Sequence, residues 1–598
     1  MKKFSIIVAL LFCVLSLQAE SYGILVNGTT YYAADYRGKD DNTGQYDEYL
    51  AHVPFQAGDR FQLCNAVARE VWAVNLDTYS VKGFTRDGDH YNVSVTGCFD
   101  CYIKLKYGED QLYIGNGSGC GEGEDYAHVY TGSVPYQCEA VLMQAFFNES
   151  YKPDAPGVDR FGDTRWSTLL PQAAEIGQYF DYVWLPPSAN GDGMGYHPKQ
   201  YSNQNSNWGT RYELEQLIEA LHNAGAKVVA DIVINHCAGW TSWCDFPEMD
   251  FGEFGTFYPD ASYICVNDEV NADWNKESAG SCWGKASGSY DDGENWDGAR
   301  DWSHDKVYVQ EMFKAYLKWM RKVMKYDGFR YDKGDGFNNW HHDNYNKAAK
   351  PEIAFMESYN GDDRIISEIE QANRNLMALD FQTKWQAFDA IAGFNYSKCQ
   401  GSGLLGRGYA KYAVTFIESH DWFMRPDNEN EFGGRNKSMT EELKDRLLQA
   451  NAFLLGMPGV PCVFYPHWYQ YKEALKPMIE ARKLAGVHSE SPVSDESVDE
   501  NGYQCTVKGK YGWLILQLGN RTTHTSEGDF WWLSDYKLVA KGPGYAMWVN
   551  RTEPIITTDI EQSYEESYRP SATKTLRDGH IVIERDGKMF SIIGERLR

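Results

Sequence analysis

An alternation of eight short apolar runs with helical segments, between about residues 138 and 489, constrains the fold most. The helical segments are amphipathic, because in residues 211–223 and 307–325 apolar side chains recur every three to four positions. Eight strand–helix alternations predict an α/β fold, a (β/α)8 TIM barrel. The predicted strands are 140–145, 182–185, 227–234, 328–332, 364–369, 387–391, 413–418 and 460–465.

The chain on either side of this alternation has the pattern of β structure. Residues 20–137 contain short alternating stretches separated by Gly, Asn and Asp, which predicts a β-sandwich. Residues 490–551 predict an antiparallel β domain, followed by a linker at 552–571 and a strand-rich tail at 572–598. Within the barrel region, 138–489, the stretch 237–304 is too long for a structureless loop, so we expect an inserted subdomain there.

Residues 1–19 have the composition of a secretory signal peptide. Lys2 and Lys3 precede an apolar run, 4–17, that is too short to span a bilayer. We therefore expect a secreted, extracellular protein, and attachment to the cell surface stays open. Twelve cysteines follow the signal, and an oxidising compartment predicts disulfides among them. The pair Cys98 and Cys101 also has the spacing of half a zinc site, but export favours disulfides.

Charge and aromatic content narrow the class of partner. The chain has 84 acidic and 57 basic residues, a net charge of −27 that repels phosphate backbones and anionic lipid. We therefore expect neither nucleic-acid binding nor membrane insertion, and we expect a monomer. Aromatic residues make up 15% of the chain; their flat rings suit sugars, although a large aromatic core is the simpler explanation.

Charged side chains gather at the C-terminal ends of the predicted strands, where barrel enzymes place their active sites. Three carboxylates at one barrel mouth suit glycoside cleavage with retention, which needs a nucleophile and an acid/base. The residues at these strand ends are Asn235, His236, Arg330, Asp332, Glu368, His420 and Asp421.

Two of these carboxylates have surroundings that suit opposite roles. Arg330 precedes Asp332 by two residues, so both side chains face the mouth, and the guanidinium favours the ionised form that a nucleophile needs. Glu368 follows apolar residues and would lie among other carboxylates, which suits an acid. Glu370, two residues further on, faces the same way and is a rival acid.

Together these stretches resemble an α-amylase of glycoside hydrolase family 13. The resemblance rests on residues 231–236, 328–332, 367–368 and 416–421, with further matches at 195–198, 207–210 and 459–465. It covers about 139–551 and implies retaining endo-hydrolysis of α-1,4-glucosidic bonds in starch, glycogen and maltodextrins. Three alternatives stay open: a relative acting on α-1,6 linkages, a transglycosylase, and a non-catalytic glycan-binding protein.

The resemblance implies a role for each matching residue. Asp332 would be the nucleophile, Glu368 the acid/base and Asp421 the residue that stabilises the transition state. Family members often carry Lys three residues after the nucleophile, where this chain has Asp335, so the leaving-group subsites and product lengths stay open. The implied substrate-binding residues are Tyr196, Trp208, His236, Arg330, Lys333 and His420.

The resemblance also implies a Ca2+ ion between the inserted subdomain and the barrel, held by oxygen ligands. The alternative is that Asn235 only caps a strand end through backbone hydrogen bonds. The implied ligands are Asn235, Asp301, the carbonyl of Gly336, and Asn267 and Asn295, which stand where plant-type relatives have Asp.

The two ends of the chain carry weaker signals. Trp72 and Tyr79 are candidate platforms for sugar stacking if the sandwich binds starch, and a plain packing domain is the alternative. The tail, 572–598, resembles C-terminal sorting signals of exported bacterial proteins.

Overall fold

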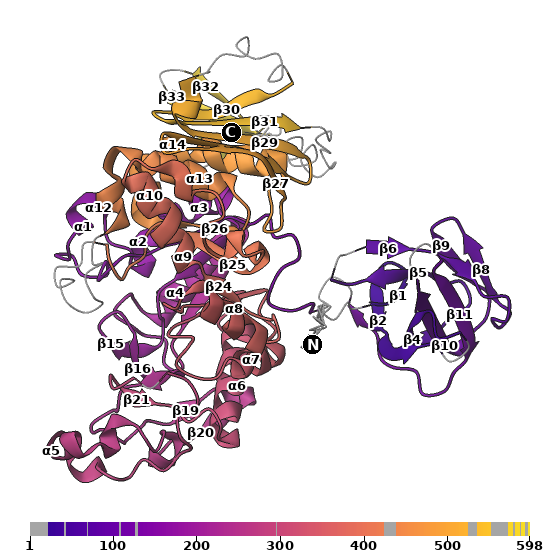
Figure 1. The fold of residues 1–598 in the computed structure, drawn as a ribbon, viewed down its shortest axis with the longest axis horizontal. Helices are drawn as coiled ribbons and strands as arrows, with labels where there is room; N and C mark the ends of the chain where they lie inside the picture. The colour runs from indigo at the N-terminus through magenta and orange to yellow at the C-terminus, as the bar shows by residue number, and fades with distance from the viewer. Residues whose placement is uncertain are drawn as a thin grey trace, which may run out of the picture. The chain divides into compact units, whose positions relative to one another are not determined.

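The computed structural model describes residues 22–40, 43–67, 70–106, 109–125, 130–294, 296–423, 438–523 and 535–551. It also describes the backbone of 572–577, 580–585, 588–591 and 596–597 (Figure 1). The predicted signal peptide, 1–19, and the predicted linker, 552–571, lie outside these residues. The chain divides into two units, Met1–Asn550 and Arg551–Arg598.

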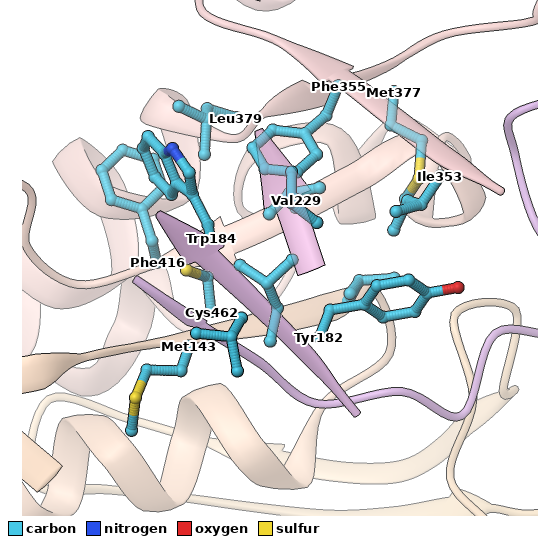
Figure 2. Packing of buried hydrophobic residues seen from close by; sticks show 14 of the residues in the cluster. Met143, Tyr182, Trp184, Val229, Ile353, Phe355, Met377, Leu379, Phe416 and Cys462 are labelled. Carbon is cyan, nitrogen blue, oxygen red and sulfur yellow. The ribbon is translucent and has the colours of Figure 1, made fainter. Parts of the chain in front are cut away.

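Eight parallel strands close into a barrel, which confirms the predicted (β/α)8 fold (Figure 1). Side chains from many of these strands fill its interior (Figure 2). Trp184 and Phe355 meet there with ring centroids 5.7 Å apart, so the barrel is a packed core rather than a pore. The strands are β13 (Leu142–Gln144), β14 (Tyr182–Leu185), β17 (Lys227–Ile232), β22 (Gly328–Tyr331), β23 (Ile353–Met356), β24 (Met377–Leu379), β25 (Ala413–Phe416) and β26 (Val460–Phe464).

Two of the eight predicted strands are wrong. Residues 364–369 lie in helix α8 (Asp362–Gln371), and 387–391 lie in helical turns, η8 (Lys384–Phe388) and α10 (Asp389–Ala392). A short apolar run does not by itself distinguish a strand from a helix. The fifth and sixth strands are β23 and β24, which begin 11 and 10 residues earlier in the sequence than predicted (353 against 364, 377 against 387).

The sequence of α8 explains why it is helical. Ile365 and Ile369, four residues apart, are buried on one face. Arg364 forms an ion pair with Glu368 one turn later, with Nε and Oε1 2.7 Å apart. Two Asp residues in the first turn interact favourably with the helix dipole.

The helices between the strands include both amphipathic segments found in the sequence. Helix α4 (Arg211–Asn223) begins with a capping box between Thr210 and Glu213, and its apolar stripe is buried. Helix α6 corresponds to the segment expected at 307–325. The longer helices of the barrel region are α3 (Ala173–Tyr179), α4, α6 (Val307–Lys322), α7 (Trp340–Ala349), α8, α13 (Leu447–Gly456) and α14 (Tyr465–Ala485).

The two ends of the inserted segment lie side by side where they join the barrel. Strand β18 (His236–Cys237) pairs antiparallel with β21 (Arg300–Asp301), at the two ends of the segment. Between them lie the hairpin of β19 (Met249–Asp250) and β20 (Thr256–Phe257) and a disulfide, Cys244–Cys282. This pairing places Asp301 opposite His236, directly beyond β17.

The N-terminal region is β-rich, as predicted. One sheet has the order β12-β2-β1-β5-β9-β8, with β6 also paired to β5, and the other has the order β3-β4-β10-β11-β7. Cys98 is bonded to Cys120, so Cys98 and Cys101 are not half of a zinc site. The strands are β1 (Tyr22–Val26), β2 (Thr30–Ala33), β3 (Asp35–Lys39), β4 (Asp47–Phe55), β5 (Arg60–Asn65), β6 (Glu70–Trp72), β7 (Asn75–Leu76), β8 (Phe84–Asp87), β9 (His90–Val93), β10 (Gly97–Leu105), β11 (Gln111–Asn116) and β12 (Glu124–Asp125).

The C-terminal part is also built of strands. A five-stranded sheet has the order β27-β28-β29-β31-β30, and the last unit has a four-stranded sheet, β32-β33-β34-β35. No helix in the described part of the chain has the length and apolar character needed to cross a membrane. The strands are β27 (Val493–Val498), β28 (Gly502–Lys508), β29 (Gly512–Gly519), β30 (Lys537–Gly542), β31 (Tyr545–Arg551), β32 (Ala572–Arg577), β33 (His580–Arg585), β34 (Lys588–Ser591) and β35 (Arg596–Leu597).

Candidate active site

A buried arginine organises the carboxylates at the C-terminal ends of three neighbouring strands. Arg330, on β22, is fully buried. Its Nη1 donates to Asp231 Oδ1 at 2.8 Å and to Asp332 Oδ1 at 2.7 Å. Its Nη2 forms an ion pair with Glu357 Oε1 at 2.7 Å. One guanidinium therefore holds three carboxylates together, because β17, β22 and β23 are adjacent and parallel.

Glu357, and not Glu368, lies at the end of the fifth strand. Glu368 is fully buried on α8, where its Oε1 accepts hydrogen bonds from Arg364 and Asn360. The rival acid Glu370 pairs with Arg374 on the same helix. The placement of Glu368 at the barrel mouth is therefore wrong, because it depended on a strand that is a helix. Four apolar residues that end directly before Glu357 were the signal that could have located it.

Burial and like charge set the protonation of the two carboxylates nearest Arg330. Burial raises the pKa of Glu357 to about 8; Arg330 opposes this shift, and Asp421 and Asp332 add to it. Burial also raises the pKa of Asp332 to about 6, again against the effect of Arg330. Arg330 does favour the ionised form of Asp332, as expected, but burial outweighs this effect, so the net shift of the Asp332 pKa is upward. The proton is therefore held more firmly by Glu357 than by Asp332.

Asp421, which follows β25, faces the same group. Its side chain is 24% exposed, and its Oδ2 accepts hydrogen bonds from Tyr359 Oη at 3.1 Å and Ser419 Oγ at 3.3 Å. Tyr359 Oη also lies 3.1 Å from Glu357 Oε1, so its single O–H is within hydrogen-bond distance of both carboxyl groups. The phenol therefore links Asp421 to Glu357, a connection that sequence reasoning missed.

Three predicted sugar-binding residues lie beside the carboxylates. Tyr196 donates from Oη to Asp231 Oδ2 at 2.8 Å, and its ring stacks on His420 at 5.1 Å between centroids. His420 Nδ1 lies 2.9 Å from Gln144 Nε2. His236 is buried, its Nε2 lies 2.8 Å from the Tyr196 carbonyl, and burial lowers its pKa to about 3, so this imidazole is neutral at neutral pH.

The other two predicted sugar-binding residues have different surroundings. Trp208 is fully buried and donates from Nε1 to the Met194 carbonyl at 2.9 Å, so its assignment to direct sugar contact is corrected. This hydrogen bond connects Trp208 to the turn that directly precedes Tyr196. Lys333 does lie next to the carboxylates: its backbone N–H donates to Glu357 Oε2 at 3.3 Å, and its Nζ lies 3.1 Å from Glu294 Oε2.

Residues implied for calcium meet where the inserted segment joins the barrel. Asn235 Nδ2 lies 3.4 Å from Asp301 Oδ1. The backbone of Gly336 lies against the same amide, because a Cβ added there would be 2.2 Å from Asn235 Oδ1. Asp301 Oδ2 is buried and has no hydrogen-bond partner. Burial, followed by the charges of Asp268 and Asp291, raises the pKa of Asp301 to about 8.

Asp291, which sequence reasoning missed, completes this group. Its Oδ2 is also inaccessible to solvent and without a hydrogen-bond partner. Asn267 Oδ1 accepts from the Asp291 N–H at 2.8 Å, so Asn267 positions Asp291 through the backbone. Asn295 lies outside the described residues. Two carboxylate oxygens without donors, beside an amide oxygen, suit a hard cation.

Comparison with known proteins identifies the barrel. Residues 174–387 match the family described as "Alpha amylase, catalytic domain". This segment is an alpha-amylase catalytic domain. The chain is 26% identical over 444 residues to "Probable alpha-amylase 2" of Arabidopsis thaliana, which is 70% of this chain and 95% of that protein.

Two further relatives are similar over shorter shares of their own length. "Alpha-amylase 3, chloroplastic" of Arabidopsis thaliana is 25% identical over 433 residues, 68% of this chain and 44% of that protein. "Glucan 1,4-alpha-maltotetraohydrolase" of Stutzerimonas stutzeri is 27% identical over 396 residues, 59% of this chain and 65% of that protein. Each alignment covers more of this chain than residues 174–387 alone.

The amylase domain contains a second group that could hold a metal ion. Asp292, Asp305 and His341 each offer one ligand atom, and these atoms all lie within 4.8 Å of one another. The group includes an imidazole, which the group around Asn235 and Asp301 does not.

Proposed function

We propose that this protein is a secreted endo-acting α-amylase that hydrolyses α-1,4-glucosidic bonds in starch, glycogen and maltodextrins with retention of configuration. One observation supports it above the others. A single guanidinium, that of Arg330, holds Asp332 and Glu357 at contacts of 2.7 Å, while their pKa values stand at about 6 and about 8. Retaining glycosidases need this division between an ionised and a protonated carboxyl group.

The first half of the reaction assigns a role to each carboxyl group. Asp332 attacks the anomeric carbon and forms a glycosyl ester, while Glu357 transfers its proton to the glycosidic oxygen, whose bond to that carbon breaks. Asp421, on the far side of Tyr359, stabilises the positive charge that develops on the sugar ring. Arg330 stays charged and fixes the separation of the two reacting carboxyl groups.

The second half uses the same groups in reverse. Glu357, now a carboxylate, accepts a proton from water; the water oxygen bonds to the anomeric carbon, and the ester bond to Asp332 breaks. Glu357 is again protonated and Asp332 again ionised. Tyr196 offers a ring for stacking on the sugar, and the imidazoles of His236 and His420 can hydrogen-bond its hydroxyl groups.

We infer that Asn235, Asp291, Asp301 and the Gly336 carbonyl would hold Ca2+. The support is the pair of buried carboxylate oxygens without partners and the close approach of Gly336 to Asn235. When bound, the ion compensates the charge of these carboxylates and fixes the inserted segment to the barrel. The reacting groups at Arg330 lie outside this ligand set.

We also propose that the sandwich, 20–137, binds α-glucan. Four rings lie in a row: centroids are 5.1 Å apart for Tyr36 and Tyr49, 4.8 Å for Tyr49 and Tyr22, and 6.0 Å for Tyr22 and Trp72. Tyr36 is 58% exposed, so this row reaches the surface. Tyr79, although 86% exposed, lies outside the row and is the weaker of the two platforms suggested by the sequence.

Incubation with soluble starch tests the main proposal. We expect new reducing ends whose first anomer, observed by NMR, is α, together with oligosaccharides of several lengths. Release of the β anomer first would contradict retention, and binding without new reducing ends would indicate a glycan-binding protein. A preference for branched glucan over linear amylose would favour the α-1,6 alternative.

A further inference from the structure

We propose that Asp292, Asp305 and His341 bind one divalent transition-metal ion, such as Zn2+, which ties helix α7 to the inserted segment. The three residues come from different parts of the chain: Asp292 from the inserted segment, Asp305 from the turn between β21 and α6, and His341 from the first turn of α7. His341 Nε2 lies 3.1 Å from Asp292 Oδ2 and 3.7 Å from Asp305 Oδ1.

The charges of this group are unbalanced without a cation. In the part of the chain that the structure describes, neither Asp292 nor Asp305 pairs with a lysine or an arginine. Their shared partner is one imidazole nitrogen, whose single N–H donates well to one carboxylate at a time. A metal ion at the same point would accept the lone pair of Nε2 and an oxygen from each carboxylate.

Two of the three ligands are held in place by their surroundings. His341 is fully buried and its ring lies 3.7 Å from that of Trp340 between centroids, so packing holds the ring, while its Nδ1 has no hydrogen-bond partner. Asp292 Oδ1 accepts from the Asn338 N–H at 3.1 Å, which leaves Oδ2 directed at His341. The Asp305 side chain is 46% exposed, so the third side of the site is open to an entering ion and to water.

The ligand types distinguish this site from the calcium group. Zn2+ is commonly bound by imidazole nitrogen together with carboxylate oxygen, whereas Ca2+ takes oxygen alone. Three protein ligands leave a fourth position for water, in agreement with the exposed side at Asp305. Asp291 and Asp292 are adjacent in sequence, so the two sites would share one loop and hold different ions.

The experiment uses the full-length protein, stripped of metal with a chelator and then kept in excess Ca2+ so that oxygen-only sites are filled. Zn2+ is titrated by calorimetry, and Co2+ is titrated by visible absorption, which reports nitrogen coordination. We expect one Zn2+ per chain and a melting temperature that rises with Zn2+, since an ion bound only by the folded state stabilises it.

Two variants and a matched control make the test specific. His341→Asn and Asp305→Asn should each weaken Zn2+ binding by about tenfold or more. Asp305 is half exposed, so its variant should fold normally even if the buried His341→Asn does not. His222→Gln removes the imidazole of another His–Asp pair, His222 Nε2 to Asp327 Oδ2 at 2.7 Å, and should bind Zn2+ as the unmodified protein does.

Absence of Zn2+ binding in excess Ca2+ would overturn the proposal. Binding that is unchanged in Asp305→Asn would overturn the three-ligand site, whatever His341→Asn shows. Because calorimetry and absorption report the metal directly, these outcomes are independent of whether the enzyme cleaves starch.

Discussion

Glu357 and Asp301 are both buried carboxyl groups of the amylase domain, and burial raises the pKa of each to about 8. Their neighbours differ. Glu357 lies 2.7 Å from Arg330, a permanent cation, whereas Asp301 faces the carboxylates of Asp268 and Asp291. A buried carboxyl group that keeps a proton beside an arginine suits acid catalysis, and a buried carboxyl group whose neighbours are other carboxylates suits a cation. The same shift thus indicates two functions.

The largest expected effect separates the two groups by activity. Asp332→Asn and Glu357→Gln should each lower kcat on starch on the order of 10⁴-fold, because one removes the covalent step and the other the proton donor. Asp301→Asn, measured in Ca2+, should lower kcat far less. Reducing-end assays on the purified variants provide the measurement.

Glu368→Gln is the control for the finding that Glu357, and not Glu368, lies at the end of the fifth barrel strand. Glu368 pairs with Arg364 on α8, so this variant should lose some stability and keep kcat within about tenfold. An inactive, folded Glu368→Gln beside an active Glu357→Gln would reverse the assignment of the acid.

The next largest effect concerns the calcium group. Removal of calcium should lower the stability of the protein and leave the catalytic role of Glu357 unchanged. A chelator should lower the melting temperature by several degrees, since Ca2+ at 100 times its Kd contributes about 2.7 kcal/mol. Asp301→Asn should reduce the response to chelator, and Glu357→Gln should keep it. A melting temperature that changes with neither chelator nor added Ca2+ would contradict the proposed calcium site.

The dependence of kcat/KM on pH should have a maximum, with one of the two carboxyl groups at the barrel mouth responsible for the decrease on each side. Asp332 must be ionised, so kcat/KM should fall as pH drops below about 6, by up to tenfold per pH unit. Glu357 must be protonated, so kcat/KM should also fall as pH rises above about 8.

In the calcium group, the ionisation of Asp301 should affect the stability of the protein rather than its activity. The pKa of Asp301 is raised from its ordinary value of 3.8 to about 8, so its contribution to stability is present at low pH. In the chelated protein that contribution should be lost between about pH 4 and 8, and Asp301→Asn should reduce the loss. A loss that Ca2+ does not lessen would assign the effect to other buried acids.

The smallest expected effect concerns the sandwich. Protein that begins near Tyr136 should still cleave short maltooligosaccharides, since the sandwich carries none of the reacting carboxylates. It should adsorb a few-fold less to granular starch, because two linked sites raise the effective affinity. Tyr36→Ala should reproduce part of that loss and Tyr79→Ala should not. Loss of activity on short substrates would mean that the sandwich supports the barrel.

Much of the barrel could be predicted from the sequence because its signals are local. Helix α4 begins and ends where its apolar stripe and capping residues indicate, and Arg330 and Asp332 were placed correctly because strand and charged end are contiguous. The fifth strand could not be predicted in this way. Residues 353–356 are all apolar, whereas 364–369 combine three Ile with Arg, Ser and Glu, and periodicity over so few residues does not separate strand from helix.

Tertiary structure decided what local signals leave open. Pairing of β23 between β22 and β24 selects 353–356 as the strand and places Glu357 against Arg330. Folding of the inserted segment brings Asp291 and Asp292 to residues that are distant in sequence, and burial of Trp208 removes it from any sugar. The sequence by itself determined which chemistry-bearing residues follow β17, β22 and β25, because that depends on neighbours along the chain. Which carboxyl groups share a cation, and which lose water, depends on contacts between strands and loops that only the closed barrel creates.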